Sequence, residues 1–244
     1  MSPVVSIAVR AASRFRPIRT WLAVAALPLT AAVTLAMAPA QGAGAKPAAQ
    51  SKPAAAPAAQ SAGSGELFRV DDVHSLALFR VHHLGAGQFW GRFNAVSGTI
   101  RFAEGSSDGL SFEITIDATS VDTGVEQLDK HLKSPDFFNV KEFPQMTFKS
   151  TSASREPNGT YTVKGDLTIR GVTKPISAAV EWTGTSEKGM GKRAGFEATF
   201  TVDRSLFGVN YGLDDKTGDA LGRNVRVVVA LEAISANSQP QEPK

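Results

Sequence analysis

Residues 110–117 of this chain read Leu-Ser-Phe-Glu-Ile-Thr-Ile-Asp, so every second side chain is apolar and those between are polar. Successive side chains of a β-strand point to opposite faces, so this alternation predicts a strand with one buried and one solvated face. The same pattern recurs over residues 161–169, 176–182, 196–202 and 225–231. Strands of this kind are typical of antiparallel sheets.

Turn residues separate these strands. Glu156-Pro157-Asn158-Gly159 predicts a hairpin, and the Gly/Ser-rich stretch 105–109 predicts a second turn. One short helical segment is expected over 125–133, ended by Pro135. Because no layer of helices is available to cover the apolar face, the sheet must pack on another sheet or close on itself. We therefore expect an all-β fold, an antiparallel barrel of about eight strands.

The N-terminal residues 1–38 are predicted to be a secretory signal peptide. A basic stretch ending at Arg19 precedes an apolar run over 21–37, and Ala36-Met37-Ala38 has the small-x-small pattern of a cleavage site. The alternative is a retained membrane anchor, because the run approaches the ~20 residues that span a bilayer. The sequence therefore predicts a periplasmic or secreted protein, with anchoring by 21–37 as the alternative.

Composition divides the rest of the chain. Residues 39–65 are rich in Ala and Pro and are predicted to be a disordered linker, followed by a folded unit over 66–235 and a disordered tail over 236–244. The full chain has a net charge of +3. Residues 1–38 contain four arginines and no acidic residue, so the rest of the chain has a net charge of −1. A nearly neutral chain does not predict a nucleic-acid partner. With no cysteine, the chain has neither a disulfide framework nor a thiolate nucleophile.

Several motifs in this folded unit resemble those of the YceI-like family of bacterial periplasmic proteins. They are Asp71-Asp72-Val73-His74-Ser75, Phe79-Arg80-Val81-His82-His83-Leu84-Gly85, Asp129-Lys130-His131-Leu132-Lys133-Ser134-Pro135-Asp136-Phe137-Phe138-Asn139-Val140, Gly165-Asp166-Leu167-Thr168-Ile169-Arg170-Gly171 and Asp203-Arg204-Ser205-Leu206-Phe207-Gly208. The resemblance covers essentially all of 66–235. Two departures are Leu128, where the family often has Arg, and Asp72, where Pro is common.

The resemblance implies an extended, lipocalin-like barrel that carries or stores a long-chain isoprenoid or similar amphiphilic lipid in its lumen. The ligand would be an isoprenoid, a quinone or a fatty-chain lipid, and no other cofactor is expected. The side chains expected to line the lumen are Phe79, Phe89, Trp90, Phe93, Phe102, Leu132, Phe137, Phe138, Phe143 and Phe148. The candidates for contact with a polar head group are Arg92, Asp129, His131 and Arg204. Such a carrier could also contact membranes transiently or form a homodimer.

Metal binding and catalysis are not expected. His82 and His83 are adjacent on a predicted strand and would face opposite sides, and no His pair has the spacing of a metal motif. We expect Asp71 and His74 to form a local hydrogen bond at a strand start. No catalytic residue is assigned, although a lipid-acting enzyme that uses Asp129 and His131 is one alternative. The other is an envelope interaction module with a filled core, which the volume of the lumen would distinguish from a carrier.

Overall fold

The computed structural model describes residues 65–189, 191–214 and 218–238. The predicted signal peptide, the linker up to residue 64 and the tail from residue 239 lie outside these residues. The elements are β1 (Glu66–Val70), β2 (Leu76–His83), β3 (Gly87–Phe93), β4 (Val96–Phe102), β5 (Ser111–Asp117), η1 (Ala118–Ser120), β6 (Val121–Asp122), α1 (Glu126–Lys133), β7 (Gln145–Arg155), β8 (Tyr161–Ile169), β9 (Val172–Ser186), β10 (Arg193–Asp203), η2 (Arg204–Phe207) and β11 (Asn224–Ser235).

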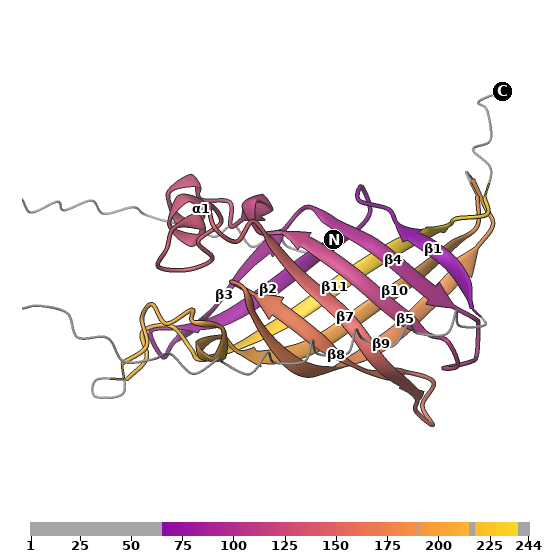
Figure 1. The fold of residues 1–244 in the computed structure, drawn as a ribbon. Coiled ribbons are helices and arrows are strands. Elements are labelled where there is room, and N and C mark those ends of the chain that lie inside the picture. The colour runs from indigo at the N-terminus through magenta and orange to yellow at the C-terminus, as the bar shows by residue number, and fades with distance from the viewer. Residues whose placement is uncertain (1–64, 190, 215–217, 239–244) are drawn as a thin grey trace, which may run out of the picture. The chain divides into compact units, whose positions relative to one another are not determined.

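Eight of these strands close into an antiparallel barrel. Their order is β1-β4-β5-β7-β8-β9-β10-β11, and β1 completes the circle by pairing with the end of β11. β2 pairs with the first half of β11, and β3 and β6 continue the sheet from there. Figure 1 shows the tilted strands wrapped around one axis, with α1 at one end. Closure hides the apolar face without a helical layer and confirms the expected all-β barrel.

The strand predictions hold in outline, and β9, β10 and β11 extend beyond the predicted ranges. Residues 156–159 form the β7–β8 hairpin, with the Gly159 amide donating to the Glu156 carbonyl at 2.9 Å. α1 ends at Lys133, as predicted, and begins at Glu126, one residue later than expected. β9 starts at Val172 and contains Pro175. β10 pairs with β9 only from Ala179 onward, so β9 has no partner on that side at Pro175. Pro175 therefore needs no hydrogen bond on that side, which is where a strand tolerates proline.

The two ends of the barrel differ. At the end distant from α1, the ring of Phe102 packs against those of Tyr161, Trp182 and Phe196, with centroids 6.4, 5.7 and 5.0 Å away. The Phe196 ring also meets that of Phe112 at 5.5 Å. We call this cluster the aromatic plug. It fills the lumen at that end, so access to the interior must come from the end covered by α1, the mouth.

None of the helices in the described ranges is both long and apolar enough to cross a membrane.

Candidate functional site

The mouth half of the barrel encloses a cavity of about 600 Å³. All but four of the side chains that line it are apolar. They come from strands, from α1 with the turn that follows it, and from the residues around η2: Ala77, Leu78, Phe79, Val81, His83, Phe89, Phe93, Ile116, Leu128, His131, Leu132, Phe137, Phe138, Met146, Leu167, Ile169, Phe200, Val202, Arg204, Phe207, Val209, Tyr211, Ala220, Leu221, Val225 and Val227. Three of these, His83, Tyr211 and Ala220, are exposed, so the cavity reaches the surface at the mouth.

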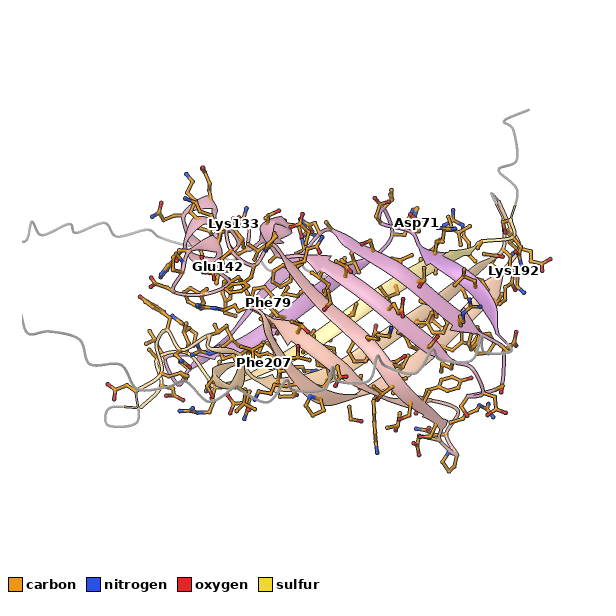
Figure 2. The ribbon with its side chains drawn as sticks, viewed as in Figure 1. Asp71, Phe79, Lys133, Glu142, Lys192 and Phe207 are labelled. Atoms are coloured by element: carbon orange, nitrogen blue, oxygen red, sulfur yellow. The ribbon has the colours of Figure 1, made fainter. Side chains whose placement is uncertain are left out.

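The alternation of β2 and β3 builds one wall of this cavity. Phe79 lies opposite Gly91 on the neighbouring strand, and a Cβ atom at residue 91 would come within 2.3 Å of the Phe79 ring. Glycine is therefore required for that ring to lie flat against β3. The ring of Phe93 stands 5.6 Å from that of Phe79 and 5.2 Å from that of Phe138. Figure 2 labels Phe79 of β2 and Phe207 of η2, which both lie in the mouth half.

A lid segment, residues 125–143, covers part of the mouth. It contributes Leu132, Phe137 and Phe138, three of the side chains expected in the lumen, to the cavity wall. Arg170, in the β8–β9 turn, holds this segment by donating to the carbonyls of Pro135 and Phe137 at 3.0 and 2.5 Å. The lid is thus tied to the barrel through its backbone.

The four polar side chains of the cavity are His83, His131, Arg204 and Tyr211, and all lie at the mouth. The imidazole of His131 packs edge-on against the rings of Phe137 and Tyr211, with centroids 4.9 and 4.7 Å away. Its Nε2 lies 3.0 Å from Oδ2 of Asp136. The wall is therefore apolar apart from these side chains, of which His83 and Tyr211 are exposed to solvent and Arg204 is buried.

Arg204 holds the second covering segment, residues 208–214 and 218–222, which we call the mouth segment. Its buried guanidinium donates four hydrogen bonds of 2.7 to 2.9 Å to backbone carbonyls, those of Val209, Tyr211, Leu221 and Gly222. Burial lowers the pKa of this guanidinium from its ordinary value. Most of its N–H groups are thus committed to the protein, and Arg204 positions the rim of the mouth.

Four predicted residues lie elsewhere than expected. Trp90 is on the outer face of β3, where the guanidinium of Arg80 stacks over its ring at 5.6 Å. Arg92 is on that same outer face and pairs with Asp122 at 2.8 Å. Phe102 faces inward but belongs to the aromatic plug. Phe143 lies outside the cavity, close to Gly171.

Asp129 also lies outside the cavity, and it does not pair with His131. Its Oδ1 accepts hydrogen bonds from the backbone amide and the hydroxyl of Thr123 at 2.8 and 2.7 Å. Two residues apart on α1, Asp129 and His131 face different ways. The acid–base pair considered from the sequence is therefore not formed. Phe148 lines a second, smaller cavity deeper in the barrel.

The sequence interpretation missed the mouth segment as a source of cavity wall. Val209, Tyr211 and Leu221 line the cavity, yet they stand in a Gly- and Asp-rich stretch with no strand or helix period. Leu128 also lines it, at the position where the family often has Arg, which makes this part of the mouth more apolar. Only the motif that precedes the mouth segment, Asp203-Arg204-Ser205-Leu206-Phe207-Gly208, pointed to it.

Asp71, His74 and Glu232 form a cluster of side chains away from the cavity. His74 Nδ1 lies 2.9 Å from Asp71 Oδ2, as predicted. With Glu232, these residues bring together three side chains of the kinds that can ligate a metal ion. Arg193 donates to Asp71 at 2.6 Å and also to Glu232. This guanidinium lowers the pKa of Asp71 to about 2. The guanidinium thus pairs with both carboxylates of this cluster.

Comparison with known proteins assigns the family. Residues 68–233 match the YceI-like domain. Protein YceI of Escherichia coli is 35% identical over 162 residues, which cover 66% of this chain and 82% of that protein. The YceI protein of Campylobacter jejuni has a similar structure, with 27% identity, a TM-score of 0.55, and coverage of 66% and 90% of the two chains.

Two further structures share the fold at lower identity. BcnA of Burkholderia cenocepacia has 24% identity, a TM-score of 0.57 and coverage of 67% and 98%. A polyisoprenoid binding domain from Saccharophagus degradans has 16% identity, a TM-score of 0.53 and coverage of 69% and 98%. Sequence match, relatives and barrel geometry agree, and the chain belongs to the YceI-like family.

Proposed function

We propose that this protein is an exported carrier or reservoir for a long-chain isoprenoid, or a lipid of similar shape, held in the barrel lumen. The observation that carries the proposal is the apolar cavity of about 600 Å³. At roughly 15–30 Å³ per non-hydrogen atom, this volume holds about 20–40 atoms, or roughly four to eight isoprene units. Each buried CH₂ contributes about 0.8 kcal/mol, so a tail of this length binds without a directional polar site.

The distribution of polar groups supports an amphiphile with its head at the mouth. His131 and Tyr211 line the cavity where it meets solvent, while the deeper wall is apolar. A head group would stay hydrated there, and the tail would displace water from the interior. The polyisoprenoid binding domain of Saccharophagus degradans, which shares this fold, is consistent with that ligand class. A signal peptide over 1–38 would deliver the carrier to the periplasm or the medium.

The geometry favours a carrier over the two alternatives. An interaction module with a filled core would leave no space of this size, because protein interiors pack with few voids larger than water. A lipid-acting enzyme built on Asp129 and His131 would need these side chains together, whereas Asp129 binds Thr123. Binding in the lumen is the function that requires the observed volume.

Native mass spectrometry of the protein purified from its own host tests this proposal. We expect a stoichiometric adduct with the mass of an isoprenoid or quinone. Val227→Trp, which fills the cavity from the inner face of β11, should remove most of the adduct. Val228→Trp, one residue along on the opposite face, is the matched control and should keep it. A bare wild-type mass, together with failure to take up added prenyl alcohols, would contradict the carrier.

A further inference from the structure

A second, smaller cavity lies deeper in the lumen, between the main cavity and the aromatic plug. Its volume is about 60 Å³ and its wall is formed mainly by apolar side chains. Along β8, Val163 lines only this small cavity, Leu167 lines both cavities, and Ile169 lines only the main one. Along β10, Ala198 lines only the small cavity, Phe200 lines both, and Val202 lines only the main one. Two strands thus place both cavities in the same order along the barrel axis.

Four side chains belong to the walls of both cavities: Ile116, Met146, Leu167 and Phe200. They come from β5, β7 and β8, which are neighbours in the barrel, and from β10, which is separated from β8 by β9. Met146 is buried and Phe200 is half-buried. These four side chains therefore form a partition across the lumen, at the bottom of the space that is open to the mouth.

We propose that this partition sets the length of the lipid tail that the protein accepts, with Met146 and Phe200 as the residues that determine it. The inference rests on the proposed function, since it takes the main cavity as the site of the tail. A tail that enters at the mouth extends until it meets the partition. Beyond that point the small cavity is separated from the tail, and the aromatic plug ends the lumen.

The chemistry of the partition fits such a role. Methionine is unbranched and flexible, so Met146 conforms to the end of a tail better than a β-branched residue would. Beyond the partition, the ring of Phe148 lies across Gly165, where a Cβ atom would come within 2.5 Å of it. This ring occupies space that a longer tail would need. The accepted length therefore depends on packed side chains.

Opening the partition should lengthen the preferred tail by a defined amount. Met146→Ala removes three non-hydrogen atoms and joins the small cavity of about 60 Å³ to the main one. At roughly 15–30 Å³ per atom the small cavity adds space for about two to four more atoms. The combined gain is about five to seven atoms, which corresponds to about one isoprene unit.

The experiment is native mass spectrometry of the purified protein after incubation with an equimolar mixture of all-trans prenyl alcohols of three to ten isoprene units. The masses of the bound alcohols give the length distribution directly. We expect a sharp upper limit for the wild type and a limit about one unit longer for Met146→Ala. Phe200→Leu, which also removes three non-hydrogen atoms from the partition, should shift it in the same direction. Val225→Ala, which enlarges only the main cavity, is the control and should leave the limit unchanged.

The outcomes separate this inference from the function on which it rests. If wild type and both partition variants bind prenyl alcohols with the same upper limit, the partition does not select tail length, although the carrier stands. If Val225→Ala shifts the limit as far as Met146→Ala does, total volume rather than the partition decides. If no alcohol of any length binds to the folded wild type, both the carrier and the partition are wrong.

Discussion

Replacing Arg204 by Met removes the side chain that holds the mouth segment. The residue is only 6% exposed, and it donates four hydrogen bonds of 2.7 to 2.9 Å to backbone carbonyls. Hydrogen bonds to a charged group contribute about 1.5–3 kcal/mol each, so four would sum to about 6–12 kcal/mol. Met has nearly the same length but cannot donate, so it isolates the loss of these bonds from a loss of packing.

Two effects make the expected net loss smaller than that sum. The substitution removes a charge whose burial is unfavourable, as the lowered pKa of Arg204 indicates. The released carbonyls can also be hydrated where the mouth segment is exposed, as at Tyr211. We therefore expect the free energy of unfolding to fall by about 2–5 kcal/mol. For a domain of this size, that corresponds to a decrease in Tm of roughly 5–15 °C.

Thermal unfolding followed by circular dichroism at neutral pH measures this effect. Arg204→Lys keeps the charge but lacks the planar fork of five donors, so its Tm should lie between those of wild type and Arg204→Met. Arg92→Met, which removes an exposed arginine on the outer face, should change Tm little. A Tm of Arg204→Met within about 2 °C of wild type would refute the assignment of Arg204 as the residue that holds the mouth.

Three further predictions concern acid stability, lumen packing and ligand binding. Arg193 lowers the pKa of Asp71 to about 2, so this carboxylate stabilises the fold above pH ~4 and the contribution is lost as pH falls toward 2. The free energy of unfolding, measured between pH 2 and 5, should therefore depend less steeply on pH in Asp71→Asn, and an unchanged slope would contradict this. Gly165→Ala should cost about 1–3 kcal/mol in urea unfolding because its Cβ meets backbone and a Phe ring at 2.5 Å, whereas Gly87→Ala, with open space around it, should be nearly neutral. Phe138→Asp places a carboxylate in the apolar wall and should lower prenyl alcohol occupancy at least several-fold in native mass spectra; undiminished binding would show that the tail does not reach this residue.

Alternation along a strand is the feature that the sequence carries most directly. Residues 161–169 form β8 with the predicted bounds, and the helix and the β7–β8 hairpin form where their local signals lie. The same alternation also contradicts one part of the lumen prediction. Phe89 and Trp90 are neighbours on β3 and cannot both face inward, and the structure places Trp90 outside.

Depth along the barrel axis is not encoded locally. Phe102 and Phe79 both face inward from strands, yet Phe102 belongs to the aromatic plug and Phe79 lines the cavity. Their depth depends on strand register, which follows from where β1 meets the end of β11 and where β2 meets its first half. Pairing between strands distant in the chain decides this, so no window of the sequence contains it.

At the mouth, too, some features follow from the sequence and others only from the tertiary structure. The sequence by itself determined an all-β chain with one apolar face per strand, a short helix near residue 130 and a set of family motifs that includes Arg204. Only the tertiary structure decided that Arg204 holds the mouth segment, that Tyr211 meets His131, and that the lumen is partitioned at Met146. The physical reason is that periodicity reports which face a side chain takes, whereas a cavity is the space left between residues that closure brings together.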